Sequence, residues 1–114
     1  MITWKNMDTL ASYAELQAAA KVDLVAAMSG ENGAERVKKY TVPMGVGLTF
    51  NYGARPVDDA ILEVLKKFAA EQQLTDKFAA LYNGEVVNTG EKRRVLHHMG
   101  RGQLGEAVQA DGVD

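Results

Sequence analysis

The sequence contains one pattern typical of nucleotide binding. Gly100, Gly102 and Gly105 are spaced as G-x-G-x-x-G, which lets the backbone approach a pyrophosphate where a strand turns into a helix. Here the glycines follow a predicted helix, and the sequence ends at Asp114, before the acidic residue that a dinucleotide site carries about 20 positions further on. We therefore interpret them as a flexible exit from that helix.

Two adjacent histidines, His97 and His98, are the only histidines of the chain. On a helix, neighbouring side chains point about 100° apart, so this pair cannot face one metal ion, and zinc-binding pairs on helices need i,i+4 spacing. An imidazole could act as a general base, but the candidate nucleophiles Ser12 and Ser29 belong to a distant helical region. We predict one histidine packed beside Leu96 and one exposed, with no metal and no catalytic role.

The densest positive cluster consists of Lys92, Arg93, Arg94 and Arg101. Guanidinium groups suit a phosphate or an RNA backbone, yet no aromatic residues are interleaved to stack on bases. We interpret the cluster as a salt-bridged surface or an interface. Three scattered carboxylates have no sequence feature that marks them for acid–base chemistry and are interpreted as surface charges: Glu31, Glu35 and Glu85.

Composition excludes further classes of function. The chain has 114 residues, 46% hydrophobic and 25% charged, with a net charge of −2, which is ordinary for one globular domain and unlike a broadly basic nucleic-acid binder. It contains no cysteine, which excludes disulfides, thiolate zinc sites, iron–sulfur clusters and cysteine nucleophiles. No apolar run approaches the ~20 residues that cross a bilayer, and no signal-peptide core is present. We expect a cytoplasmic protein with no nucleic-acid partner and no membrane association.

Three short helices are predicted in the first forty residues: one over residues 9–20, a second that follows a break at residues 21–23 and runs to residue 28, and a third over residues 34–38. Asp8 is the predicted N-cap of the first, and Gly30 is a predicted stop after the second. Asn32 precedes Glu35 by three residues, which is the spacing of a capping box for the third.

A β-hairpin is predicted between Tyr40 and Tyr52. The triplets Tyr40–Val42 and Leu48–Phe50 are rich in β-prone residues, and Gly45 and Gly47 between them permit positive φ. The segment from Gly53 to Pro56 is a predicted connector.

The clearest helix runs from Asp58, its predicted N-cap, to Gln72. Val57 and Leu62 have the spacing of a hydrophobic staple, and Glu63, Lys67 and Glu71 form i,i+4 pairs on the outer face. An apolar stripe follows the helical period: Ile61, Leu62, Val64, Leu65, Phe68 and Ala69.

Two further helices are predicted towards the end of the chain. Thr75 is expected to cap one that runs to Tyr82 and stops at Asn83-Gly84, and a last helix is expected over residues 91–99, with Val95, Leu96 and Met99 on one face. The predicted fold class is mainly α with a small β-hairpin, in a single segment spanning residues 1–114.

The stretch from Tyr82 to Arg101 resembles a segment near the N-terminus of glucose-6-phosphate isomerases, which typically reads F-x-G-E-K-I-N-x-T-E-x-R-A-V-L-H and continues x-A-L-R. Arg101 falls on the closing arginine, and Asn51-Tyr52 falls on a family D-Y-S-K-N box. The other matching positions are Gly84, Glu85, Asn88, Glu91, Arg93, Val95, Leu96 and His97. Departures at Asn51, Gly53, Ala54, Arg55, Gly90 and Arg94 suggest a divergent branch.

The resemblance implies the N-terminal helical segment of an enzyme with α/β sugar-isomerase (SIS) domains. This family interconverts glucose 6-phosphate and fructose 6-phosphate in glycolysis and gluconeogenesis, using a glutamate to move a proton between C1 and C2. It needs no cofactor or metal and forms homodimers. Its catalytic and substrate-binding residues lie downstream of the matched region, so the resemblance implies none in this chain. The implied partners are the remaining SIS domains.

Two other interpretations remain open. The chain could be a stand-alone helical interaction domain without enzymatic activity, or a phosphate or nucleotide binder that uses Arg93, Arg94, Arg101 and the glycines. If the chain is instead a segment of an isomerase, we expect no isomerase activity from residues 1–114 alone. We also expect Glu91, Arg93 and Arg101 to be structural anchors: Glu91 and Arg101 near the two ends of the last predicted helix, and Arg93 between them, bound to a carboxylate or carbonyl of a docked domain.

Overall fold

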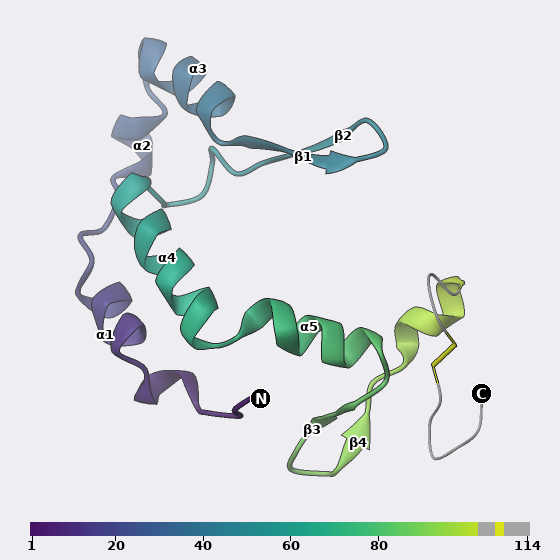
Figure 1. Ribbon diagram of the computed structural model, residues 1–114. Helices are drawn as coiled ribbons and strands as arrows, with labels where there is room; N and C mark the ends of the chain where they lie inside the picture. The colour runs from purple at the N-terminus through teal and green to yellow at the C-terminus, as the bar shows by residue number, and fades with distance from the viewer. Residues whose placement is uncertain (103–106, 109–114) are drawn as a thin grey trace. The chain divides into compact units, whose positions relative to one another are not determined.

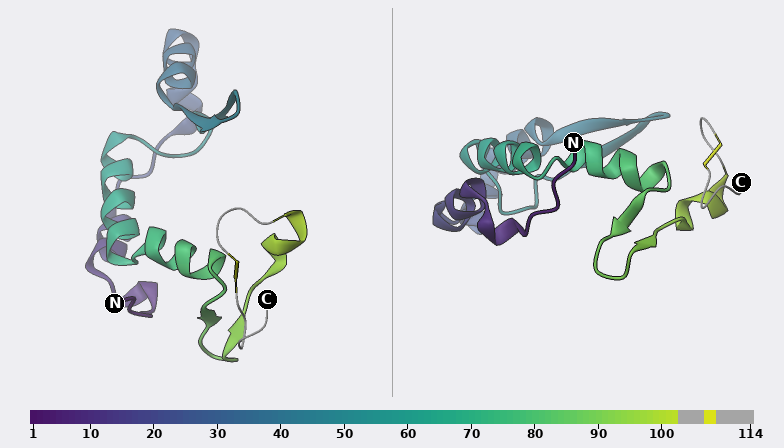
Figure 2. Two further views of the ribbon diagram at one scale, coloured as in Figure 1. Left: turned by 45° about the vertical axis from the view of Figure 1, so that its right-hand side comes forward. Right: turned by 60° about the horizontal axis from the view of Figure 1, so that its bottom comes forward.

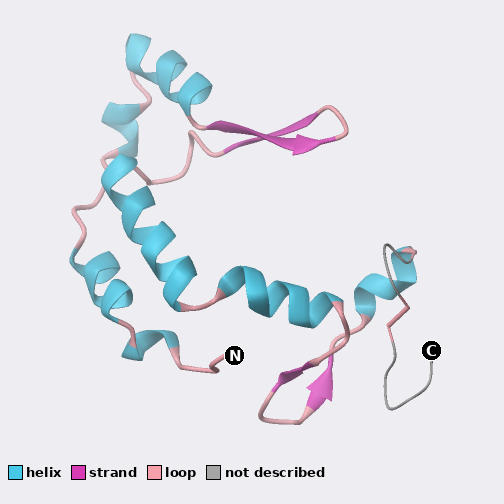
Figure 3. Cartoon of the chain, viewed as in Figure 1, coloured by secondary structure: helices cyan, strands magenta, loops and turns pink. Residues whose placement is uncertain are grey.

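The computed structural model describes residues 1–102 and 107–108, which form helices and two β-hairpins (Figures 1 and 3). The predicted class, mainly helical with a small hairpin, is confirmed, and a second short hairpin was missed. In chain order the elements are η1 (Met7–Thr9), α1 (Ala11–Ala18), α2 (Leu24–Ala27), α3 (Gly30–Lys39), β1 (Thr41–Gly45), β2 (Leu48–Asn51), α4 (Asp59–Glu71), α5 (Leu74–Tyr82), β3 (Val86–Asn88), β4 (Arg93–Arg94) and η2 (His97–Arg101).

The chain forms two compact units. One comprises Met1–Tyr13 and Lys67–Asp114, and the other comprises Ala14–Lys66. The helices α1 and α4 each contribute residues to both. Among the described residues, the buried hydrophobic side chains are only Leu10, Tyr40 and Ala80. Each unit therefore leaves much of its apolar surface uncovered.

The helices α2 and α3 open the unit of residues 14–66. Asp23 caps α2, because its Oδ1 accepts a hydrogen bond from the amide of Ala26 at 3.1 Å. Gly30 was predicted as the stop after the second helix, but α2 already ends at Ala27 and Gly30 begins α3: its φ of 60° lets the backbone turn from Ser29 directly into that helix. Asn32 therefore lies inside α3, and the predicted capping box is wrong.

The first hairpin, β1–β2, is confirmed. Its strands are antiparallel, with Val42 opposite Phe50. β1 continues through Pro43 to Gly45, so the connection shortens to Val46 and Gly47, whose φ values are 45° and 77°. Positive φ at both central residues is the requirement of a type I′ turn.

Arg36 fastens α3 to the connector that leads into α4. Its Nε donates to the carbonyl oxygen of Gly53 at 2.7 Å, and its Nη2 donates to those of Arg55 and Val57 at 2.8 and 2.5 Å. Its guanidinium also lies 4.7 Å from the ring centroid of Tyr40. One side chain thus fixes the path of the connector.

Two side chains at the end of α3, Lys39 and the C-cap residue Tyr40, complete this junction by binding Asp59 at the start of α4. The hydroxyl of Tyr40 donates to Oδ1 of Asp59 at 3.0 Å, and Lys39 Nζ lies 2.5 Å from Oδ2 of the same carboxylate. These two hydrogen bonds lower the pKa of Asp59, because they favour its charged form. The predicted N-cap of α4 is also confirmed, since Asp58 Oδ1 accepts from the amide of Ile61 at 2.8 Å.

The other unit contains η1 and the first turn of α1, which is capped from a distance. Asp8 was predicted as the N-cap of a helix from residue 9, but it lies inside η1, and α1 begins only at Ala11. The carboxylate of Glu71 instead accepts hydrogen bonds from the amide of Ser12, at 3.0 Å, and from its hydroxyl. Ser12 is fully buried, so this candidate nucleophile has a structural role.

The helix α5 also begins without its predicted cap. Thr75 lies within α5, which starts at Leu74 after Gln73 adopts a left-handed φ of 52°. The side chain of Gln73 holds the N-terminal segment: its Oε1 accepts from the amide of Thr3 at 2.7 Å, and its Nε2 donates to the carbonyl of Met1 at 3.0 Å. Figure 2 shows α5 leading into the second hairpin, β3–β4.

Candidate docking segment

The segment that carries the family-like motif, residues 84–101, starts at the end of α5. The amide of Gly84 donates to the carbonyl of Leu81 at 3.1 Å, and the amide of Glu85 donates to that of Ala80 at 2.9 Å. This pair of bonds is a Schellman motif, which requires a left-handed residue such as Gly84, with its φ of 76°. The predicted stop at Asn83-Gly84 is confirmed.

Gly84 is also a site of close packing. A Cβ atom added there would lie 3.2 Å from Cδ2 of Leu96 and closer still to the side chain of Val108. Gly84 is buried and Leu96 is half-buried. Two motif positions thus form one contact, in which any side chain at position 84 would displace its neighbours.

Arg94 joins β4 to the same point. Its Nη1 donates to the carbonyl oxygen of Gly84 at 2.6 Å, which satisfies an acceptor just beyond the helix end. From the sequence, Arg94 was a member of the positive cluster and a departure from the family pattern, where alanine stands. No spacing rule could have revealed this bond, because it depends on how β4 returns to α5.

The predicted last helix over residues 91–99 is wrong. Val86 lies opposite Arg94, and Asn88 lies opposite Arg93, in the second hairpin. Asn88 shapes its turn: Oδ1 accepts from the amide of Glu91 at 3.1 Å, and Nδ2 donates to the Glu91 carboxylate at 3.3 Å. Such local side-chain bonds compete with helix formation, and β-branched neighbours such as Val86 favour strands.

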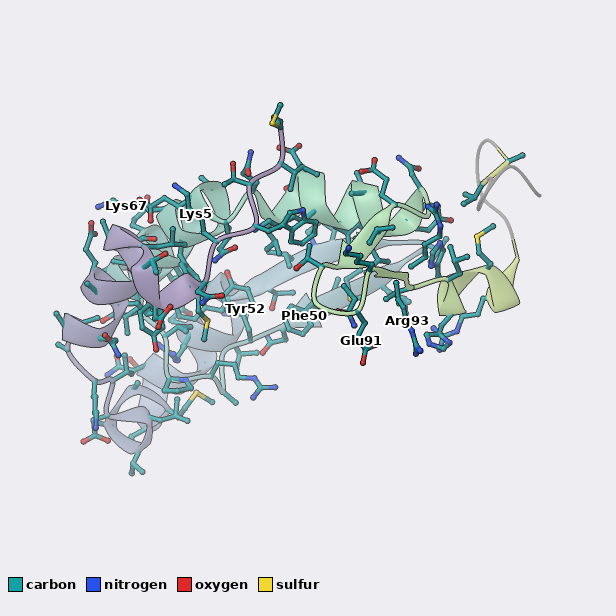
Figure 4. All side chains as sticks on the ribbon, turned by 90° about the horizontal axis from the view of Figure 1, so that it is seen from below. Lys5, Phe50, Tyr52, Lys67, Glu91 and Arg93 are labelled. Carbon is teal, nitrogen blue, oxygen red and sulfur yellow. The ribbon has the colours of Figure 1, made fainter. Side chains whose placement is uncertain are left out.

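Two charged residues of this hairpin, Glu91 and Arg93, pair with one another at its surface. Arg93 Nη1 lies 3.8 Å from Oε2 of Glu91, and both side chains are exposed. Figure 4 shows them extending from the hairpin. Glu91 is therefore not in the first turn of a long helix, and Arg101 ends the short η2. Their predicted placement at the two ends of one helix is wrong, and their anchoring role stays a prediction.

The two histidines lie in η2 in different surroundings. The ring of His98 stacks on that of Tyr82 with 4.7 Å between centroids, and its Nε2 lies 2.9 Å from the Tyr82 carbonyl oxygen. His97 is exposed. One histidine packs and one is exposed, but the packed one contacts Tyr82, where Leu96 was the predicted neighbour. His98 therefore fastens η2 to the end of α5.

The glycine pattern lies only partly within the described residues. Gly100 belongs to η2, and Gly102 follows it with a φ of 98°. Gly105 lies outside the described residues. These glycines were expected to follow a helix. Within the described residues, the helical element at this place is the short 3₁₀ helix η2, which itself contains Gly100.

The described residues offer little for binding a charged ligand. In ranges 1–102 and 107–108, no three acidic or histidine side chains are grouped so that they could hold a metal ion, and no helix is long and apolar enough to cross a membrane. A hollow of about 320 Å³ in the unit of residues 14–66 is lined partly by Arg36 and Lys39. Both cations already bind carbonyl or carboxylate oxygens.

The apolar side chains of α5 suggest contact with another protein surface. Leu74 and Phe78 are four residues apart on one helical face and are 59% and 65% exposed. Exposed apolar clusters commonly mark interaction surfaces. Because hydrogen bonds at Gly84 and Arg94 join α5 to the second hairpin, we interpret the uncovered face of α5 as a docking surface.

Comparisons with known proteins show which proteins this chain is similar to. The family model described as phosphoglucose isomerase matches residues 51–114. The chain is 45% identical to the glucose-6-phosphate isomerase of Treponema denticola over 97% of its own length, 44% identical to that of Treponema pallidum over 88%, and 32% identical to that of Borrelia garinii subsp. bavariensis over 97%. These matches cover 22%, 19% and 20% of the relatives, so the chain spans about a fifth of their length.

Proposed function

The chain belongs to the phosphoglucose isomerase family, and from this membership we propose that it is the N-terminal portion of a glucose-6-phosphate isomerase. In this proposal the whole enzyme interconverts glucose 6-phosphate and fructose 6-phosphate in the cytoplasm, as a homodimer. The residues that perform proton transfer belong to sugar-isomerase domains outside residues 1–114. This chain supplies a structural segment that packs against them.

One observation carries the structural role: apolar side chains remain exposed on well-formed elements. Leu74 and Phe78 on α5 present large apolar groups to solvent, although α5 is fixed at both ends by Gln73 and Gly84. Removing such surface from water yields about 25 cal/mol per Å². Docking on a larger body would supply this stabilisation.

The same proposal accounts for the lack of a recognisable active site in the described part of the chain. Moving a proton between two carbons requires a positioned general base and a clamp for the phosphate group. Among the described residues, the Glu71 carboxylate is bound to Ser12 and that of Asp59 to Tyr40 and Lys39. These groups maintain the fold.

A thiol-accessibility experiment tests the docking. The chain contains no cysteine, so Phe78→Cys introduces a unique thiol. Its reaction rate with a maleimide is measured in residues 1–114 alone and in a chimera, in which this chain replaces the matching fifth of the Treponema denticola enzyme and the other cysteines are removed. We expect the rate to fall by at least an order of magnitude in the chimera.

Glu35→Cys is the matched control. Its side chain is 75% exposed and pairs only with a neighbouring lysine on α3, so its thiol should react at similar rates in both proteins. If Phe78→Cys reacts as fast in a folded chimera as in the free chain, α5 does not dock and the stand-alone interaction domain becomes the better account.

A further inference from the structure

The first hairpin has one continuous apolar face. Val42 and Phe50 are directly opposite, and opposite residues of antiparallel strands share a face. Leu48 and Tyr52 lie two residues to either side of Phe50 and so belong to that face. The Tyr52 ring lies 6.0 Å from the Phe50 ring and 5.2 Å from that of Tyr40. Figure 4 labels Phe50 and Tyr52.

This face is covered only at the base of the hairpin. Tyr40 is buried and Tyr52 is half-buried, whereas Phe50 is 49% and Leu48 60% exposed. Exposure therefore increases from the junction with α3 towards the turn. The uncovered part is a contiguous row of large apolar side chains, which is uncommon on a free protein surface.

The strands also lack the usual protection of exposed edges. From Thr41 to Ala54 the sequence contains no charged residue, whereas free edge strands commonly carry lysine, other charges or proline to prevent pairing with other chains. Pro43 is the one such device in β1. An uncharged, apolar hairpin is suited to a site where another protein surface covers it.

The turn residue Val46 gives an independent indication. Its side chain is 98% exposed, and its φ is 45°. A β-branched residue in this left-handed conformation is a rare and strained choice, and asparagine or glycine would suit a type I′ turn better. Neither burial in the chain nor the turn geometry explains a valine here. Strain of this kind often marks a functional contact.

We propose that the tip of the first hairpin, with Val46 at its end, inserts into an apolar cleft on the part of the isomerase that lies outside residues 1–114. This inference rests on the proposed function. The relatives are about five times as long as the matched segment, so such a body is available. The cleft must be lined by uncharged side chains, because the hairpin offers no charge with which a buried ion could pair.

Photo-crosslinking in the chimera tests the insertion. A benzophenone amino acid replaces Val46 in the chimera described above, and mass spectrometry identifies the crosslinked peptide. We expect a peptide from outside the replaced fifth. A crosslink confined to residues 1–114, a crosslink to residues 1–114 of a second copy, or no crosslink in an active chimera would each overturn the proposal.

The same amino acid at Glu35 is the control, because this side chain is exposed on α3 in the same unit. If the benzophenone at position 35 crosslinks to the part of the enzyme outside residues 1–114 with the same yield as the one at position 46, the probe captures its surroundings indiscriminately. This result would also overturn the assignment. The proposed function is tested separately, since the accessibility of Phe78→Cys on α5 is independent of the hairpin. An active chimera with a protected Phe78→Cys thiol but no crosslink from Val46 refutes only the insertion.

Val46→Asn separates a docking role from a role in the turn. Asparagine tolerates left-handed φ, so the free chain should keep or increase its melting temperature. The chimera should melt at a lower temperature, because the apolar contact is lost. An unchanged or higher melting temperature of the chimera would mean that Val46 contacts nothing in the enzyme.

Discussion

Gly84 meets two requirements that other residue types do not. Its left-handed φ closes the Schellman motif, and its missing side chain allows the approach of Leu96. Gly84→Ala should therefore reduce the free energy of unfolding by about 1–3 kcal/mol, measured by urea denaturation of residues 1–114. Gly100→Ala is the control, since nothing lies within 4 Å of a Cβ there and its φ is not left-handed. Equal effects of the two changes would contradict the packing role of Gly84.

Glu71 should make the stability of α1 depend on pH. Hydrogen bonds from the hydroxyl and amide of Ser12 lower the pKa of Glu71 from its usual 4.5, and the nearby charges of Lys5 and Lys67 act in the same direction (Figure 4). Because the folded pKa lies below the unfolded one, the contribution is complete above the usual pKa and is lost as pH falls through the lowered value.

Glu71→Gln should consequently destabilise residues 1–114 at neutral pH, and the difference from the unchanged chain should shrink in acid. Urea denaturation at a series of pH values measures this difference, with Glu31→Gln on the exposed face of α3 as the control. A difference that stays constant down to the acid limit would show that the Glu71 charge does not cap α1.

At the scale of elements, Arg36 is the main link between α3 and α4. It makes three bonds to backbone carbonyl oxygens, and the planar fork of arginine allows all three at once. Arg36→Lys keeps the charge but loses this geometry, so we expect a loss of about 2 kcal/mol in the free energy of unfolding. Lys38→Arg, on the same helix and exposed, is the control.

A loss for Arg36→Lys no larger than that of the Lys38→Arg control would mean that the charge of Arg36, rather than its fork, holds the connector. The comparison is informative because Lys38 pairs only with Glu35 at the surface. Surface pairs of this kind contribute little to stability.

Sequence patterns predicted an element correctly where the contact that fixes it lies within a few residues along the chain. Asp58 caps α4 through an amide three residues away, and the β-prone triplets around Gly45 and Gly47 form the first hairpin. They failed where the contact was distant: Glu71 caps α1 from 59 positions away, and Arg94 bonds to Gly84 across the second hairpin. The apolar spacing of Val95, Leu96 and Met99 was misinterpreted as helical because the Asn88 turn was overlooked.

At the scale of the whole molecule, family and fold class could be predicted, but the roles of the motif residues could not. The match from Gly84 to His97 identified the family, which the comparisons confirm. It did not show that Gly84 packs on Leu96 or that Asn88 bonds to Glu91, because both contacts depend on the path of the second hairpin. Composition excluded classes of function without indicating one.

The isomerase activity of the chimera, beside that of residues 1–114 alone, tests the central claim most directly. Formation of glucose 6-phosphate from fructose 6-phosphate is followed with a coupled dehydrogenase. If this chain is the structural N-terminal portion of such an enzyme, the chimera turns over substrate at a rate similar to the parent, and residues 1–114 alone give only the blank rate. Turnover by residues 1–114 alone, or a folded chimera without activity beside an active parent, would contradict the account.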